Sequence, residues 1–116
     1  MVKNRALEDR LIKMFKQSDG YFWIGGPGEE AFNIPLGLLL NWGEGLDFDW
    51  LHPHYRSGGI LIAHGWPMID FIRQMATKFT DPFSKGRLFS NHFAVKKLNV
   101  APASSPIQVQ FAVAIG

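Results

Sequence analysis

The sequence predicts a mostly α-helical chain with at most one or two short strands. In several stretches the apolar residues recur at helical spacing, which is typical of helices with one buried face. Glycine and proline separate these stretches and mark the turns between them. Only residues 47–52 have the apolar character of a short strand, through Phe48, Trp50 and Leu51.

The first predicted helix spans residues 5–18. It is amphipathic, and we expect Gly20 to end it because glycine commonly follows the last turn of a helix. We expect its buried face to carry Leu7, Leu11, Met14 and Phe15.

A glycine-rich segment, GYFWIGGPGEE, leads into a second predicted helix at residues 29–40. Glu29 and Glu30 fall in the first turn of this helix, where carboxylates suit the helix dipole and repel phosphate. We therefore do not interpret the glycines as a phosphate-binding loop. Pro35 lies inside the helix, which either kinks there or is tighter at its start.

Residues 57–64 predict a short helix that ends at Gly65. Pro67 suits the first position of the next helix, which we expect to continue to about residue 79. Its core stripe would be Ile69, Ile72, Met75, Ala76 and Phe79.

Residues 80–103 have no helical or strand period and predict a long loop, which in a compact domain is either functional or disordered. The last predicted helix spans Ile107 to Ile115. Ser104 or Ser105 would cap it, and Pro106 would occupy its first position.

Composition limits the chain to one globular domain. It has 116 residues, of which 47% are hydrophobic and 19% charged, and this balance is wrong for a disordered chain. A net charge of +2 with scattered basic residues gives little support to nucleic-acid binding. There is no cysteine, and neither a signal peptide nor a membrane span is recognisable, so we expect a cytoplasmic protein.

Tyr55 and Arg56 stand where the predicted strand gives way to a helix. Such a junction offers free backbone N–H groups, and arginine adds a planar fork for phosphate oxygens. An anion site and a solvated or ion-paired arginine both remain open.

His52 and His54 could chelate zinc if both lie on one face of the strand, but no third ligand stands at a useful spacing.

Five segments follow one another in an order that resembles a known family. Together they resemble the N-terminal part of the alpha subunit of thiamine-diphosphate-dependent 2-oxo acid dehydrogenases, most closely the branched-chain (2-oxoisovalerate) type. The resemblance runs from about Leu7 to the last residue and covers well under half of such a subunit. The segments are GYFWIGGPGEEAF at 20–32, HYRSGGILIAHG at 54–65, MATKFTDPFSKGR at 75–87, NH at 91–92 and SSPIQVQFAVAIG at 104–116.

The resemblance implies an α/β thiamine-diphosphate-binding fold for the full subunit, of which residues 1–116 are an N-terminal fragment. It implies oxidative decarboxylation of a branched-chain or other 2-oxo acid on thiamine diphosphate. The acyl group would then pass to the lipoyl arm of a dihydrolipoyl acyltransferase. A dehydrogenase beta subunit would supply the other half of the cofactor pocket, in a heterotetramer.

Four residues match the family's cofactor contacts. Tyr55 and Arg56 match a Tyr-Arg pair that contacts the diphosphate. Ser105 and Ile107 match a Ser-Pro-Leu/Ile element that touches the central portion of the cofactor.

Two further residues match positions near the substrate. Phe22 falls at an aromatic wall of the acyl pocket, and a core phenylalanine is the alternative. His92 aligns with a histidine in a mobile loop at the active-site entrance and is the predicted catalytic residue, with an ordinary polar loop residue as the alternative.

The family's Mg²⁺ ligands would lie beyond residue 116. We therefore predict no metal ligand in these residues and expect the isolated chain to be inactive.

Two other functions remain open. One is a non-enzymatic helical interaction module from a truncated gene. The other is a small anion- or nucleotide-binding domain that uses Arg56, Lys85 and Arg87 and binds phosphate without Mg²⁺.

Overall fold

The computed structural model describes residues 1–116 and is mostly helical, which confirms the predicted class of the chain. Two isolated bridges, Leu51 to Val100 and Val95 to Val100, are its only strand-like pairings. No helix has the length and apolar character needed to cross a membrane. The elements in order are α1 (Val2–Lys16), α2 (Glu30–Leu39), α3 (Gly58–His64), α4 (Met68–Met75), the 3₁₀ helix η1 (Lys96–Leu98) and α5 (Val109–Ile115).

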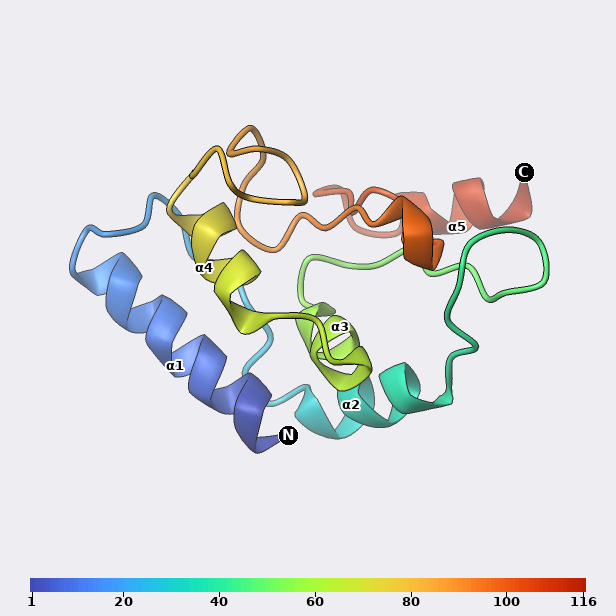
Figure 1. The fold of residues 1–116 in the computed structure, drawn as a ribbon, viewed down its shortest axis with the longest axis horizontal. Helices are drawn as coiled ribbons and strands as arrows, with labels where there is room; N and C mark the ends of the chain where they lie inside the picture. Colours follow the sequence, from blue (N-terminus) through green and yellow to red (C-terminus); the bar gives the residue numbers. More distant parts are fainter.

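The hydrophobic core lies between α1, α3, α4 and the loop at residues 83–100, and α2 contributes no apolar side chain to it. α2 packs closely on α3, and α1 contacts both α3 and α4 (Figure 1). At the centre, the rings of Phe71, Phe83 and Phe93 meet edge to face with centroids 5.2–5.8 Å apart. Such tilted arrangements place the positive edge of one ring against the negative face of the next.

Helix α1 begins and ends earlier than predicted. It ends because Ser18 adopts a left-handed conformation (φ 61°) and the Asp19 N–H returns to the carbonyl of Met14 at 2.9 Å. Gly20 has a packing role instead, since a Cβ atom there would lie 2.7 Å from Met75 Cε. Leu7, Leu11 and Met14 are buried as predicted, whereas the prediction for Phe15 is wrong because its side chain is 47% exposed.

Helix α2 includes Pro35 and begins at Glu30, one residue later than predicted, with Glu29 as its N-cap residue. Gly37 lies against α3, where a Cβ atom would stand 2.5 Å from the Ile60 carbonyl oxygen. The missing side chain lets the two helices approach closely. The predicted end of α3 is confirmed, because Gly65 follows His64 in a left-handed conformation with φ 97°.

Helix α4 is shorter than predicted. Thr77 turns left-handed (φ 49°), and the Lys78 N–H bonds to the Arg73 carbonyl at 2.9 Å, so the helix ends at Met75. The buried face is carried by Phe71 and Met75, together with the polar residues Asp70 and Gln74. The predicted core stripe is wrong at its ends, since Ile69 is 49% exposed and Phe79 77% exposed.

No strand forms at residues 47–52, where one was expected. The backbone there bonds within its own loop: the Asp49 N–H donates to the Asn41 carbonyl at 3.0 Å, and the Asn41 N–H donates to the Asp49 carboxylate at 2.8 Å. Two residues of this stretch bond to a distant segment. The Leu51 N–H donates to the Asn99 carbonyl at 3.0 Å, and the Phe48 carbonyl accepts the Asn99 side-chain amide at 3.5 Å.

The long loop predicted at residues 80–103 contains one short element, η1. Buried carboxylate and amide groups shape it. Asp81 accepts N–H donors from Phe83, Ser84 and Gly86 at 2.9–3.2 Å, which closes the turn at the start of the loop. Near its end, Asn99 bonds to both the N–H and the carbonyl of Gly45.

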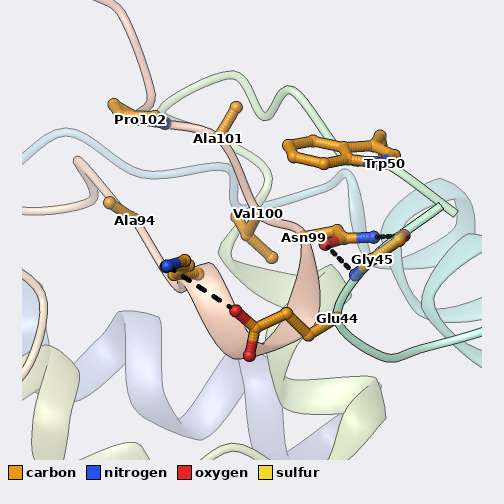
Figure 2. Close-up of a pocket in the computed structure, with 9 residues that line it drawn as sticks. Glu44, Gly45, Trp50, Ala94, Asn99, Val100, Ala101 and Pro102 are labelled. Atoms are coloured by element: carbon orange, nitrogen blue, oxygen red, sulfur yellow. Dashed lines mark hydrogen bonds and ion pairs between the residues drawn. The ribbon is translucent and has the colours of Figure 1, made fainter. Parts of the chain in front are cut away.

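The bond between Asn99 and Gly45 forms one side of a surface hollow of about 440 Å³ (Figure 2). The ring of Trp50 stands over this hollow, and Glu44 faces Lys96 at its rim with 3.8 Å between oxygen and nitrogen.

Helix α5 starts later than predicted. Gln108 is left-handed (φ 73°), so the helix begins at Val109, and neither Ser104 nor Ser105 caps it. Figure 1 shows α5 at the opposite end of the molecule from α1. None of its residues is buried.

Candidate functional site

Four of the six residues singled out from the sequence line one cavity of about 330 Å³: Phe22, Tyr55, His92 and Ser105. Ile24 and Phe89 complete its walls. The lining comes from the segment after α1, the turn before α3, the long loop and the segment before α5. The cavity is mostly aromatic, and its lining residues carry three polar side-chain groups: the hydroxyls of Tyr55 and Ser105 and the imidazole of His92.

His92 is buried, and both of its ring nitrogens have partners. Nε2 lies 2.7 Å from Ser105 Oγ, and Nδ1 lies 3.1 Å from the backbone carbonyl oxygen of Ser90. Its ring is nearly parallel to that of Tyr55, with centroids 6.2 Å apart and planes inclined by 18°. The ring is therefore fixed by two hydrogen bonds and one stacked neighbour.

The residues around His92 fasten the cavity walls to one another. Ser90 Oγ donates to the Phe22 carbonyl at 2.7 Å, and the Asn91 amide donates to the Ile24 carbonyl. Since Phe22 and Ile24 are wall residues, these bonds set where that wall stands relative to the imidazole. We call residues 90–92 the tether.

Gln74 anchors the tether to α4. Its side chain is fully buried, and its amide donates to the His92 carbonyl at 2.8 Å. The Gln74 Oε1 atom is buried without a hydrogen-bond partner, which costs free energy, so the bond from its amide to His92 indicates a positional role for this glutamine.

Tyr55 and Arg56 are held at the start of α3. The buried amide of Asn33, on α2, donates to the Arg56 carbonyl at 3.0 Å, and His54 Nδ1 accepts the Arg56 N–H at 3.2 Å. The Arg56 guanidinium is exposed, takes part in no ion pair and lies 5.6 Å from the centre of the Tyr55 ring. Burial, and then the charge of Arg56, lower the pKa of His54.

One predicted residue lies apart from the others. Ile107 is 65% exposed and does not line the cavity. Arg56 stands beside the cavity through Tyr55 without lining it.

A buried carboxylate supports the wall from behind. Glu8, on α1, accepts the indole N–H of Trp23 at 3.1 Å and the N–H of Gly26 at 3.4 Å. Burial raises the pKa of Glu8, and these two donors partly oppose the rise. Trp23 stands between Phe22 and Ile24 in the chain, so this contact fixes the segment that carries both wall residues.

No three His, Asp or Glu side chains are grouped so as to hold a metal ion. His52 and His54, considered as a zinc pair from the sequence, therefore have no third ligand here. His54 instead lies against Tyr55, with ring centroids 3.8 Å apart.

Comparison with known proteins finds relatives of this chain among curated proteins. No family model matches the chain. The 2-oxoisovalerate dehydrogenase subunit alpha of Bacillus subtilis is 28% identical over 116 residues, which are 100% of this chain and 34% of that protein. The chain is homologous to part of a 2-oxoisovalerate dehydrogenase alpha subunit.

Two more alpha subunits of this family have higher identity. That of Pseudomonas aeruginosa is 31% identical and that of Caenorhabditis elegans, a mitochondrial protein, 34%; each match covers 100% of this chain. It covers 27% and 26% of these relatives, so the chain spans about a quarter to a third of the dehydrogenase subunits it matches. Their names place the homology among oxidoreductases of the 2-oxo acid dehydrogenase family.

The sequence did not reveal the residues that hold the cavity together: Ile24, Asn33, Gln74, Phe89, Ser90 and Asn91. One signal was available. Ser90, Asn91 and His92 form a polar run between two phenylalanines in a hydrophobic chain, and Asn91 has the left-handed backbone that asparagine tolerates (φ 63°).

Proposed function

We propose that this chain forms part of the thiamine-diphosphate site of a 2-oxo acid dehydrogenase alpha subunit of the branched-chain type. The reaction would be oxidative decarboxylation of a branched-chain 2-oxo acid, with acyl transfer to a lipoyl arm. One observation carries the proposal. Phe22, Tyr55, His92 and Ser105, chosen by their match to the family's sequence pattern, meet at one cavity.

The residues at this site fit both the diphosphate and the organic rings of such a cofactor. The Arg56 guanidinium has no carboxylate partner, so it is free to bind phosphate oxygens in a bidentate manner. The rings of Phe22, Tyr55 and Phe89 offer apolar surface to the organic rings of the cofactor, and Ser105 offers a polar contact there. When bound, thiamine diphosphate would supply the electron sink for carbanion chemistry.

The proposal places the Mg²⁺ ligands outside these residues. Mg²⁺ needs several oxygen ligands in near-octahedral geometry, and no suitable group of side chains occurs here. We therefore assign the Mg²⁺ ligands, and the remaining walls of the pocket, to residues outside this chain, including a beta subunit. On this basis we propose that the isolated chain is inactive, and decarboxylase turnover by these 116 residues would contradict that part.

Nuclear magnetic resonance of the isolated chain with inorganic diphosphate, without Mg²⁺, tests the anion part of the proposal. We expect the Arg56 Nε–H signal to shift in a saturable way at millimolar ligand. Arg73 is a matched control in the same spectrum, because its guanidinium already bonds to Asp70 at 2.9 Å. Equal shifts for both arginines, or none for Arg56, would count against a diphosphate contact.

The competing function, a helical interaction module, has one observation in its favour: α5 has no buried residue. It predicts no response at Arg56 to diphosphate. The small anion-binding domain predicts that Lys85 and Arg87 respond together with Arg56, so the same titration separates the three functions.

A further inference from the structure

The two hydrogen bonds of His92 determine which way the Ser105 hydroxyl points. A backbone carbonyl can only accept, so the contact between Nδ1 and the Ser90 oxygen requires a proton on Nδ1. In a neutral imidazole, Nε2 is then the acceptor. At 2.7 Å, Ser105 Oγ must therefore donate its only proton to Nε2.

This arrangement leaves Ser105 with lone pairs, and no proton, for a molecule in the cavity. We propose that neutral His92 is a positioning residue that makes Ser105 an obligatory acceptor, so that the cavity selects ring ligands carrying an N–H or O–H donor. The aromatic side chains of Phe22, Tyr55 and Phe89 supply the surfaces for the ring. A ligand that presents only an acceptor atom would place its lone pair against a lone pair of Ser105 Oγ, and no hydrogen bond could form between them.

The rest of the site keeps this polarity in place. Gln74 holds the His92 carbonyl, and the stacked ring of Tyr55 limits rotation of the imidazole. Ser90 is itself fixed by its bond to the Phe22 carbonyl, so its own carbonyl stays beside Nδ1. A flip of the imidazole would break both of its hydrogen bonds, and this is costly because His92 itself is buried.

The inference concerns the same cavity as the proposed function but does not depend on thiamine diphosphate. Its test uses neither the cofactor nor a metal, so either idea can fail alone. The first measurement is the tautomer of His92, read from long-range ¹H–¹⁵N couplings of the neutral ring. We expect the Nδ1–H form, with an Nε2 signal that moves in Ser105→Ala and stays in place in Ser104→Ala. An Nε2–H tautomer would overturn the proposal.

The second measurement compares three ring probes of similar shape by chemical-shift titration. Indole carries a donor, 1-methylindole carries neither donor nor acceptor, and 1-methylbenzimidazole carries an acceptor. We expect indole to bind about fivefold more tightly than 1-methylindole, the size of one ordinary hydrogen bond. Ser105→Ala should remove the difference, and Ser104→Ala should preserve it. Equal binding of indole and 1-methylindole to the unaltered chain would refute donor selection.

A final variant separates positioning from simple structural support. His92→Phe keeps an aromatic ring beside Tyr55 but frees the Ser105 proton. We expect 1-methylbenzimidazole to bind more tightly to this variant than to the unaltered chain, because Ser105 can now donate. A purely structural role predicts weaker binding of all three probes, and that result would contradict the proposal.

Discussion

Arg5 Nε lies 2.6 Å from Glu30 Oε1 and joins the first helix to the first residue of the second. A second bond, from Arg5 Nη2 to Glu30 Oε2 at 3.0 Å, makes the pair bidentate. The Gly28 N–H also donates to this carboxylate, at 2.9 Å. The pair therefore fixes both the approach of α1 to α2 and the end of the glycine-rich segment.

This pair makes stability depend on pH in the acid range. The hydrogen bond from Arg5, then donors of the backbone, lower the pKa of Glu30 from 4.5 to about 2. The folded chain thus binds fewer protons than the unfolded chain between these values. The contribution of Glu30 is present above pH 4.5 and is lost as the pH falls toward about 2.

We expect Glu30→Gln to lower stability at neutral pH and to flatten the loss of stability between pH 4.5 and about 2. Urea unfolding midpoints over this range would measure both effects. Glu44→Gln is the control, because Glu44 is exposed and its only ion pair is long, at 3.8 Å. If the two variants had the same acid dependence, the Arg5 contact would not be the cause.

Trp23→Phe tests the support behind the cavity wall. It removes the indole N–H that bonds to the buried carboxylate of Glu8, and we expect a cost of about 1–3 kcal/mol. Burial already raises the pKa of Glu8, so protonation should relieve the unpaired charge and the cost should shrink as the pH falls. Trp50→Phe, at a 65% exposed position, should be nearly neutral at all pH values. A cost for Trp23→Phe that did not change with pH would argue against this charge effect.

Gly37→Ala sets two opposite effects against each other. Helix propensity alone favours alanine by about 1 kcal/mol. The new Cβ atom would stand 2.5 Å from the Ile60 carbonyl oxygen, and overpacking of this kind costs about 1–3 kcal/mol. We expect the clash to decide and the variant to unfold at lower temperature, whereas Leu38→Ala on the exposed face should change little. A more stable Gly37→Ala would mean that α2 and α3 can move apart at no cost.

Phe93→Ala would remove a fully buried ring from the centre of the aromatic core. Truncation of a buried phenylalanine typically costs about 3–5 kcal/mol, a large share of the stability of a small domain. Phe79→Ala is the matched comparison, because that ring is 77% exposed and its loss should cost less than about 1 kcal/mol. Chemical denaturation of both variants measures the difference, and similar costs would show that the core is not centred on Phe93.

The sequence predicted those features that depend on local chemistry. Gly65 ends α3 because only a residue without a Cβ atom adopts its backbone readily, and Glu30 lies in the first turn of α2, where a carboxylate suits the helix dipole. Local patterns did not show where a side chain forms a hydrogen bond to a distant residue in place of the local bond that the sequence suggests. Ser105 resembled a helix cap, but its hydroxyl bonds to His92, thirteen positions earlier in the chain.

The cavity was harder to predict than the helices. Family resemblance selected Phe22, Tyr55, His92 and Ser105, which do line it, but Ile107 stands outside. Bonds between Ser90, Asn91 and the distant segment at 22–24 have no sequence signature, because any exposed carbonyl could serve as their acceptor. The exposure of Phe79 was missed because periodicity does not show that α4 ends at Met75.

The tether also bears on the order in which the chain folds. Its bonds from Ser90 to Phe22 and from Asn91 to Ile24 close loops of 68 and 67 residues, more than half of the chain. Contacts of such long range are slow to form, because loop-closure entropy is lost before the contacts stabilise the structure. The helices can form from local interactions, so we expect these two bonds to form after the helices. A ligand that fills the cavity would contact residues from both halves of the chain.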